Sequence, residues 1–406
     1  MKRAEDILSK LLLQNNDDWE IENVVCDDSV EEIRITLKYR HSTIKVDGNE
    51  FPILDFRHKR SWRHLDMWQY KTVLEEKIPR YRDGVKVKSV PVPWALPNSR
   101  LSWLMEKTVE TLQSTKKQTK TARLLRLSFE QVHGVMLRAV ERGLEKRDKN
   151  RIYKHVCMDE KSIRRGHEYV SMLYDWETGQ VIEVESGRKS ESVDNLCTKA
   201  LTEEQCNAVE TVCTDMWEAF INGALKYFPN ARHCHDLYHC VTYLNDAVDK
   251  VRKREVKEFK ELRHTKYMWL KDMSRYTPND RMRFDKLENA EYQVSQAWKV
   301  KELFRDLLRL HYRGDVEAYG MLGDWMADAL QYNIGEINDV VFMFKRHLKG
   351  IINAMVTGAN NGKAERTNGS IQEIKTIGRG YGTAERYRIA ILFFYGGLDM
   401  SIVNLH

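Results

Sequence analysis

Three acidic residues, far apart in the sequence, lie where carboxylates can do chemistry. Asp159 ends a short apolar run of strand type, residues 154–159, and Asp215 follows a second such run, residues 208–214. Glu365 lies in the first turn of a helix predicted after Asn360-Asn361-Gly362, where the helix dipole favours negative charge. Two divalent ions held about 3.5–4 Å apart by carboxylates can activate an attacking oxygen and stabilise a leaving one in phosphoryl displacement. Because the chain has 60 acidic residues, the positions of these three, rather than their number, support a metal site.

Basic residues near these carboxylates could neutralise a phosphodiester. Lys161, Arg164 and Arg165 closely follow Asp159. At 100° per residue, the helix after residue 362 has one apolar and one polar face. The apolar face holds Ala364, Ile371, Ile374 and Ile377, and the polar face holds Glu365, Asn368, Gln372, Thr376 and Arg379. Asn368 could position a metal ligand or a phosphate, or it could belong to a solvated face.

The charge is mildly positive and unevenly distributed. The formal net charge is +6, and basic residues outnumber acidic ones in residues 57–90, 114–147 and 250–266. Several basic blocks indicate a polyanion contacted at several places, although each block alone is also typical of a solvated surface. No run approaches the roughly 18 apolar residues of a membrane span, and residues 1–9 lack an apolar signal core. We therefore expect a cytoplasmic protein with no membrane partner, whose seven cysteines are free thiols.

Changes in composition divide the chain into five segments. Residues 1–97 form a small β-rich module that ends in a proline-rich linker, and residues 98–150 are helical. Residues 151–238 alternate strands and helices, which predicts a mixed α/β sheet. Residues 239–350 are almost wholly helical and read as an insertion, and residues 351–406 add the final helices. The fold class expected is therefore α/β with several domains.

The segment 98–150 has helix–turn–helix character. Ala122 and Leu125 would face inward, and Ser128 is a good N-cap for a helix over residues 132–144. Basic residues in and around this pair of helices could contact DNA, namely Lys117, Lys120, Arg138 and Arg142. An ordinary helical pair inside a larger domain is the alternative, since such patterns also arise by chance.

Short motifs, in a specific order over residues 35–406, resemble one known family. They are Ser61-Trp-Arg-His-Leu65, Val92-Pro-Trp-Ala-Leu-Pro97, Met158-Asp-Glu-Lys-Ser162, Arg165-Gly-His-Glu-Tyr169, Thr214-Asp-Met216, Asp236-Leu-Tyr-His239, Lys266-Tyr-Met-Trp-Leu270, Asn361-Gly-Lys-Ala-Glu365 and Arg379-Gly-Tyr381. The chain is similar to transposases of bacterial insertion sequences of the ISL-three family, a branch of the DDE class.

This resemblance implies a ribonuclease-H-like catalytic core with Asp159, Asp215 and Glu365 as the metal-binding triad and the helical insertion between the second and third. The implied cofactor is Mg²⁺, with Mn²⁺ as a substitute. The implied partners are double-stranded DNA, as transposon ends and target, and a second copy of the chain or more. Asp236 and His239 are placed near the catalytic pocket, where His239 could assist proton transfer or touch phosphate, or serve only in the core or as a cap.

One departure from the family pattern concerns zinc. Family members carry an N-terminal zinc knuckle and a second Cys/His pair, but residues 44–48 and 81–84 of this chain hold no cysteine. His58 and His64 alone are too few for a tetrahedral site. We therefore expect no zinc, with packing around Phe51, Ile53, Trp62 and Trp68 taking its place.

Two other groups have competing interpretations. The cluster His233-Cys234-His235 is more typical of a strand-to-helix junction than of a zinc site. Trp269, Trp298 and Trp325 are more typical of a helical core than of base stacking, which stays open for Trp269.

The function expected is a DNA transposase that binds the terminal inverted repeats of its element. It would cleave the ends by metal-dependent hydrolysis and join the 3′ hydroxyl to target DNA. The alternatives are a non-catalytic DNA-binding regulator derived from a transposase and a structure-selective nuclease that performs no strand transfer.

Overall fold

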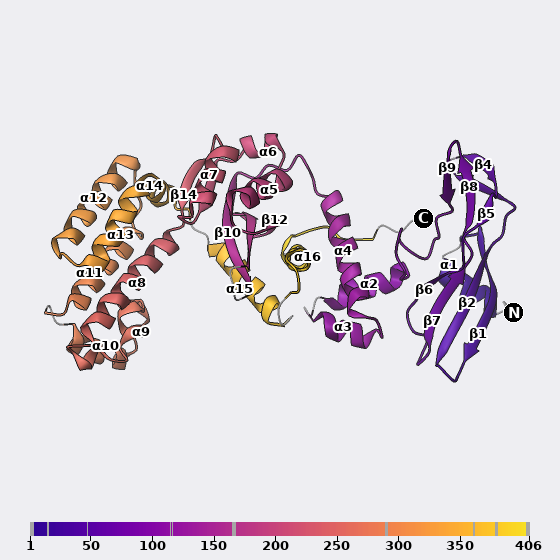
Figure 1. Cartoon of the computed structure of the whole chain (residues 1–406), viewed down its shortest axis with the longest axis horizontal. Helices are drawn as coiled ribbons and strands as arrows, with labels where there is room; N and C mark the ends of the chain where they lie inside the picture. Colours follow the sequence, from indigo (N-terminus) through magenta and orange to yellow (C-terminus); the bar gives the residue numbers. More distant parts are fainter. Residues whose placement is uncertain are drawn as a thin grey trace. The chain divides into compact units, whose positions relative to one another are not determined.

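The structure of the chain is a computed structural model that describes residues 4–13, 16–46, 48–113, 115, 117–164, 168–288, 291–359, 362–377 and 381–402. The chain folds into two compact units (Figure 1). The first unit is Met1–Arg147 together with Leu398–His406, and the second is Asp148–Gly397. Each unit is described by itself below.

The first unit begins with small sheets. Helix α1 (Ala4–Leu13) precedes a four-stranded sheet in the order β1-β2-β7-β6, in which only β2 and β7 are parallel. These strands are β1 (Trp19–Asp27), β2 (Glu32–Tyr39), β7 (Lys71–Glu76) and β6 (Arg60–Arg63). A hairpin joins β3 (Thr43–Val46) to β4 (Asn49–Pro52), and a third sheet contains β5 (Asp55–Phe56), β8 (Pro79–Asp83) and β9 (Lys86–Ser89). The β-rich module is therefore present, with β1, β8 and β9 in addition to the predicted strands.

Tryptophan packing forms the core of this module. The ring of Trp94 lies edge to face against Trp19, at 4.9 Å between centroids, and against Trp62, at 5.4 Å. Phe51 packs against this core, as we expected, but the expectation for Trp68 is wrong. The Trp68 side chain is 89% exposed in a left-handed backbone conformation, so it takes no part in the core.

Three helices complete the first unit: α2 (Trp103–Gln113), α3 (Gln118–Leu124) and α4 (Phe129–Glu145). Ser128 caps α4, because its hydroxyl accepts the Gln131 N–H while the Gln131 side chain accepts the Ser128 N–H. Ala122 is buried and Leu125 packs against the same core. The predicted N-cap and inward-facing residues are therefore confirmed, and α4 begins three residues earlier than expected.

The second unit contains a five-stranded sheet in the order β12-β11-β10-β13-β14. Its strands are β10 (His155–Arg164), β11 (Glu168–Asp175), β12 (Val181–Ser186), β13 (Thr211–Thr214) and β14 (Arg232–His235). Strands β10, β11 and β12 pair antiparallel, whereas β13 and β14 continue the sheet in parallel from β10. The predicted mixed sheet is therefore confirmed.

Helices surround this sheet (Figure 1). The helices in contact with it are α5 (Ser190–Ala200), α7 (Glu218–Tyr227), α14 (Leu348–Thr357), α15 (Gly362–Ile377) and α16 (Ala384–Tyr395), and the short α6 (Glu203–Asn207) precedes β13. The apolar residues of 216–228 predict that Trp217, Phe220, Leu225 and Phe228 are buried. Phe220 and Phe228 are buried, but Trp217 is 42% and Leu225 61% exposed, because helical spacing alone does not show how wide the buried face is.

The segment between β14 and α15 is helical, as predicted. It contains α8 (Leu237–Glu255), α9 (Lys266–Leu270), α10 (Pro278–Leu287), α11 (Gln293–Leu307), α12 (Asp315–Gln331), α13 (Gly335–Arg346) and α14 (Leu348–Thr357), with single 3₁₀ turns at Lys260–Leu262 and Met273–Arg275. Trp269, Trp298 and Trp325 are buried in one shared hydrophobic cluster. Trp269 is therefore a core residue whose indole N–H donates to Thr265 Oγ1 at 3.0 Å, and base stacking on it is excluded in this conformation.

Candidate active site

Strand register brings three aspartates to one edge of the sheet in the second unit. The last row of the two parallel ladders joins residues 158, 214 and 235. The next residue of each segment is an aspartate, namely Asp159, Asp215 and Asp236. Because parallel strands that end in the same row present their carboxyl ends at one edge, these side chains lie close together.

Asp159 itself does not end a strand, contrary to the sequence-based expectation. Strand β10 continues to Arg164 through its antiparallel pairing with β11, in which Asp159 lies opposite Met172. Only the parallel ladder with β13 stops at residue 158. The end of the apolar run therefore marks the end of the parallel pairing with β13. The polar residues of β10 that follow pair only with β11.

Asp236 completes this group from the start of α8. Its carboxylate caps the helix by accepting the Tyr238 N–H at 3.0 Å, and its own N–H donates to the carbonyl of Thr214 at 2.8 Å. Nε2 of His239, one turn further along, lies 3.8 Å from Asp236 Oδ2. The junction of β14 and α8 thus places a buried carboxylate and a half-exposed imidazole beside the other acids.

Burial, and then repulsion between acids, raises the pKa of the carboxyl groups at this edge. Burial first, and then repulsion by Asp215 and Asp236, raises the pKa of Asp159 to about 6, although His239 opposes this. Burial also raises the pKa of Asp215 and of Glu365, with repulsion from Asp236 in both cases. Acidic groups with raised pKa values in one place are typical of functional sites.

Helix α15 carries Glu365 and is fixed to the sheet by its neighbours. The Asn368 side chain donates to Asp159 Oδ2 and accepts the Tyr174 hydroxyl at 2.5 Å. Thr367 Oγ1 donates to the carbonyl of Gly179 at 2.8 Å, and Lys375 Nζ donates to that of Ser162 at 2.6 Å. These contacts hold α15 against β10 and the turn before β12.

Asn368 is therefore not part of a solvated face. It is 8% exposed and joins three elements, β11 through Tyr174, α15 and β10 through Asp159. The amide fixes the rotamer of Asp159 and the position of α15 at once. The helical pattern correctly predicted that Asn368 shares a face with Glu365, but it could not show which partner lies opposite.

Arg188 is a residue near the site that the sequence analysis missed. Its guanidinium pairs with Glu160 at 2.9 Å and lies over the rings of Tyr169 and Trp217, at 4.2 and 4.7 Å from their centroids. The Trp217 backbone N–H donates to Asp215 Oδ1 at 2.9 Å, and its indole N–H donates to the carbonyl of Arg188 at 3.0 Å. A lone Arg after a strand gives no sequence signal, because its role depends on two aromatic rings from distant segments.

The other predicted DNA contacts of the second unit are only partly described. Lys161 is half-buried. Burial lowers the pKa of Lys375, and the positive charge of Lys161 lowers it further. The backbone of Arg164 ends β10, but its side chain lies outside the described residues, as do Arg165 and Arg379.

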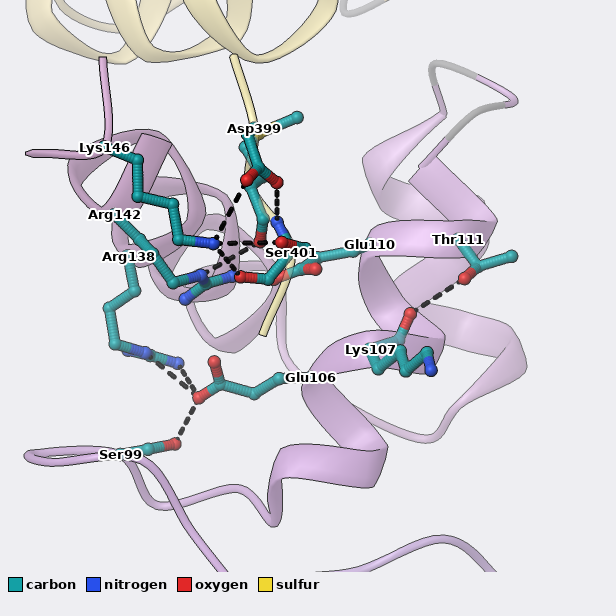
Figure 2. A network of polar contacts seen from close by, with 11 residues as sticks. Ser99, Glu106, Lys107, Glu110, Thr111, Arg138, Arg142, Lys146, Asp399 and Ser401 are labelled. Carbon is teal, nitrogen blue, oxygen red and sulfur yellow. Dashed lines mark hydrogen bonds and ion pairs between the residues drawn. The ribbon is translucent and has the colours of Figure 1, made fainter. Parts of the chain in front are cut away.

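In the first unit, Arg138 and Arg142 are held in internal ion pairs (Figure 2). Arg138 pairs with Glu106 at 2.7 Å and Arg142 with Glu110 at 2.6 Å. Arg142 Nε also donates to the carbonyl of Met400 at 2.9 Å. These contacts favour a structural role in joining α2, α4 and the C-terminal segment.

Lys117 and Lys120 differ from these arginines. Both are exposed at the start of α3, and neither forms an ion pair with a residue that the structure describes. Exposed lysine side chains without an internal ion pair can reach a phosphate backbone, because no internal contact has to break first.

The donor set around Asp159 suits a hard divalent cation. The three predicted ligands are all carboxylates, which Mg²⁺ and Mn²⁺ prefer. Burial first, and then repulsion between neighbouring acids, raises their pKa values, and a bound cation would offset both effects. In the described ranges, no three His, Cys, Asp or Glu side chains already surround a common point. Asp159 Oδ1 accepts the Glu160 N–H at 2.7 Å and Oδ2 accepts the Asn368 amide, but each oxygen keeps a lone pair for a metal.

Comparison with known proteins identifies the class. A family model described as a transposase of the DDE class, ISL3 type, matches residues 156–391, which include the whole sheet edge and α15. The chain belongs to this family of transposases, enzymes whose class transfers polynucleotide strands with the help of divalent metal ions.

Two named relatives agree with this assignment. The transposase for insertion sequence element IS1557 of Mycobacterium tuberculosis is 24% identical over 350 residues, covering 79% of this chain and 78% of that protein. The transposase for IS1001 of Bordetella parapertussis is 23% identical over 357 residues, covering 83% and 85%. A solved structure, the Drosophila P element transposase strand transfer complex, covers 73% of this chain and 92% of its own at 8% identity and a TM-score of 0.39.

The family match confirms the predicted resemblance and the general function of a DNA transposase. None of the helices in the described part of the chain is long and apolar enough to cross a membrane.

Proposed function

We propose that Asp159, Asp215 and Glu365 bind the catalytic Mg²⁺ ions of this transposase, with Mn²⁺ as a substitute. The observation that supports this proposal best is the shared row of β10, β13 and β14, which aligns Asp159 and Asp215 at one sheet edge. The hydrogen bond from Asn368 to Asp159 brings α15, and with it Glu365, to the same edge. Three segments far apart in the sequence thus supply one carboxylate each.

The chemistry proposed is cleavage of the transposon end and joining of its 3′ hydroxyl to target DNA. Bound divalent ions would lower the pKa of the attacking water or hydroxyl and offset the charge on the leaving oxygen. Asn368 holds the Asp159 carboxylate in one orientation, and Oδ2 of Asp236 lies 3.8 Å from Nε2 of His239. His239 is half-exposed, so it can donate to a phosphate oxygen or move a proton at the leaving oxygen.

We further propose that the first unit binds the terminal inverted repeats of the element. The capped helix α4 and the exposed Lys117 and Lys120 support this, because such helices place basic side chains on the phosphate backbone. Two DNA ends joined in one event require at least two copies of the chain, so we propose a homodimer or larger assembly on DNA.

The test compares cutting and joining of a duplex that carries the element's end, in Mg²⁺ and in Mn²⁺. Asp159→Asn, Asp215→Asn and Glu365→Gln should each reduce both reactions by about 10³-fold or more, by analogy with the loss of a principal catalytic group, without loss of end binding. Asp324→Asn, an exposed carboxylate on α12, is the matched control. Binding without cutting by the unchanged protein would favour the non-catalytic regulator, and cutting without joining would favour the nuclease.

A further inference from the structure

A DNA strand at the carboxylates of the candidate active site needs cations beside it, because phosphate and carboxylate groups repel each other. The sequence suggests three residues for this role, but Lys161 is half-buried and the side chains of Arg164 and Arg165 lie outside the described residues. The structure adds Arg188. Burial raises the pKa of Asp215, and the positive charge of Arg188 acts on it in the opposite direction, so this guanidinium lies close to the carboxylate edge.

A sharp turn after β12 brings Arg188 to this place. Gly187 has a φ of +87°, in the left-handed region, and a Cβ on it would lie 2.5 Å from the Ser192 hydroxyl oxygen. Its N–H donates to the Tyr169 carbonyl at 2.7 Å, and its carbonyl accepts the Ser171 hydroxyl at 2.8 Å. The backbone that carries Arg188 is therefore tied to β11.

Two aromatic rings and one carboxylate hold the Arg188 guanidinium. Its central carbon lies 4.2 Å from the ring centroid of Tyr169 and 4.7 Å from that of Trp217. Nη1 donates to Oε1 of Glu160 at 2.9 Å. These contacts order a long, flexible side chain before any ligand is present, which lowers the entropy cost of binding one.

These contacts leave one edge of the guanidinium unused. A guanidinium has five N–H groups, but only Nη1 of Arg188 has a hydrogen-bond partner among the residues that the structure describes. Nε and Nη2 are not buried, and the side chain as a whole is 32% exposed. The two parallel N–H groups of this edge are those with which arginine binds two oxygens of a phosphate.

Trp217 joins Arg188 to Asp215. Its backbone N–H donates to Asp215 Oδ1 at 2.9 Å, and its indole N–H donates to the Arg188 carbonyl at 3.0 Å. The residue whose ring supports the guanidinium therefore also orients the carboxylate. A phosphate bound to Arg188 would consequently lie near a proposed metal ligand.

We propose that the open edge of Arg188 binds a phosphate of the DNA strand, next to the phosphate that is cleaved. This role rests on the proposed function, which brings a DNA strand to Asp159, Asp215 and Glu365. The cleaved phosphate would be held by the metal ions on these carboxylates, so the guanidinium is left for a neighbouring phosphate of the same strand. A purely structural role accounts for the contact with Glu160 but not for the open pair of N–H groups beside the carboxylates.

The test measures single-turnover cleavage of the element's end by the full-length protein in Mg²⁺. The substrates are the unmodified duplex and a set of duplexes in which one phosphate near the cut is an uncharged methylphosphonate. The variants are Arg188→Ala, Arg188→Lys and the matched control Arg151→Ala. Arg151 also pairs with a carboxylate, that of Asp175 at 2.5 Å, and lies over a ring, that of Tyr153 at 4.8 Å, but it precedes β10, whereas the proposed ligands follow residue 158.

We expect Arg188→Ala to cleave the unmodified end about 10- to 100-fold more slowly, the usual cost of losing hydrogen bonds to a charged group. Arg188→Lys should recover only part of this loss, because an ammonium cannot form two parallel bonds. Arg151→Ala should change the rate less than about twofold. All rates are measured well below the lowest thermal midpoint of the four proteins.

The deciding quantity is the ratio of the rates on a modified and on the unmodified duplex, since it does not depend on how much of a variant is folded. At one linkage beside the cut, the methylphosphonate should slow the unchanged protein and Arg151→Ala by about tenfold or more, but Arg188→Ala by less than about twofold. An unchanged rate for Arg188→Ala, or the same ratios for Arg188→Ala and the unchanged protein at every linkage, would overturn the proposal and leave the metal site in place. If the unchanged protein does not cleave the end at all, the proposed function is wrong and this role of Arg188 falls with it.

Discussion

The side chains of the site depend on single contacts that fix their orientation. Asp159 could adopt several rotamers at the sheet edge, but the Glu160 N–H and the Asn368 amide hold its two oxygens. Asn368 is held in turn by the Tyr174 hydroxyl at 2.5 Å. Asp159 and Asp215 could be singled out from the sequence because an acid after an apolar run is a visible signal, and Glu365 because it lies in the first turn of a predicted helix. The Tyr174–Asn368 pair was not, since its members are 194 residues apart.

Removing the Asn368 amide should impair the metal site without unfolding the protein. We expect Asn368→Ala to lower activity by about 10- to 100-fold, the usual cost of losing a group that orients a metal ligand, and to raise the Mn²⁺ concentration needed for half-maximal activity. Gln372→Ala, one turn further along the same helix and exposed, should leave both unchanged. The measurement is a metal titration of end cleavage, and equal titrations for the two variants would contradict the orienting role.

The raised pKa of Asp159 gives a prediction on stability. The pKa is about 6 in the folded chain against an ordinary value of 3.8. Between pH 3.8 and pH 6 the folded state therefore binds more protons than the unfolded state. Stability from this group is therefore present at low pH and is lost as the pH rises from about 4 to 6. Without divalent ions, Asp159→Asn should raise the thermal midpoint at pH 7.5, and it should raise it less at pH 5.

Metal should reverse this effect in the unchanged protein. Mn²⁺ at pH 7.5 should stabilise it, because a ligand that binds only the folded state raises the midpoint, and it should stabilise the Asp159→Asn variant much less. The control is Asp324→Asn, whose thermal midpoint should respond to Mn²⁺ as that of the unchanged chain does. Equal stabilisation of all three proteins by Mn²⁺ would argue against Asp159 as a ligand.

At the scale of elements, the register of the parallel strands decides where the acids lie. The alternation of strands and helices in residues 151–238 was readable, because apolar runs and turn residues mark each element. The extension of β10 beyond Asp159 was not readable. Its residues 160–164 are mostly polar and are held in the sheet by β11 alone, so no apolar pattern marks them.

The arginines of α4 show a second limit of pattern reading. The pattern of α4 cannot show the acids of α2 that lie opposite Arg138 and Arg142, because these acids come from a different element. Glu106 is fully buried and bonds both Arg138 and the Ser99 hydroxyl. Figure 2 shows these two contacts of Glu106. A buried carboxylate of this kind depends on its cation.

Arg138→Ala should therefore destabilise the first unit. We expect a loss of about 2–4 kcal/mol, because removing one partner leaves a buried charge unpaired, although the 26% exposure of the Arg138 side chain admits some water. Lys120→Ala should behave in the opposite way. Its stability should be unchanged, whereas its affinity for DNA should fall and should depend less steeply on salt concentration. Urea unfolding and duplex binding measure the two effects. A stable Arg138→Ala protein with reduced DNA affinity would restore the original assignment of Arg138 as a DNA contact.

At the scale of the whole molecule, the chain leaves its first unit at residue 147 and returns to it at residue 398. Composition predicted the helical insertion, but it placed all of residues 351–406 in one segment. The return is not visible in the sequence, because it depends on contacts of a few tail residues with α4, among them hydrogen bonds from Arg142 and Lys146 to backbone carbonyls of the tail. Lys146 Nζ donates to the Ser401 carbonyl at 2.6 Å and to its hydroxyl at 2.9 Å (Figure 2).

Gly143 permits this return, since it leaves room for the tail on α4. An ideal Cβ at Gly143 would lie 2.7 Å from Cβ of Leu398 and 3.3 Å from Cγ of Met400. Glycine inside a helix is otherwise unfavourable, costing about 0.5–1 kcal/mol relative to alanine. Gly143 therefore lowers the stability of α4, but it allows residues 398–400 to contact this helix.

The effect of Gly143→Ala should consequently change sign when the tail is removed. In the full chain the methyl group collides with Leu398, so we expect the substitution to destabilise the first unit or to release residues 398–402. In a chain that ends at Gly397 nothing opposes the methyl group, and the substitution should stabilise α4 by about 0.5–1 kcal/mol. Hydrogen exchange of residues 139–145 measures this in all four proteins of the double-mutant cycle. The same sign of change with and without the tail would show that the tail does not dock on α4 in solution.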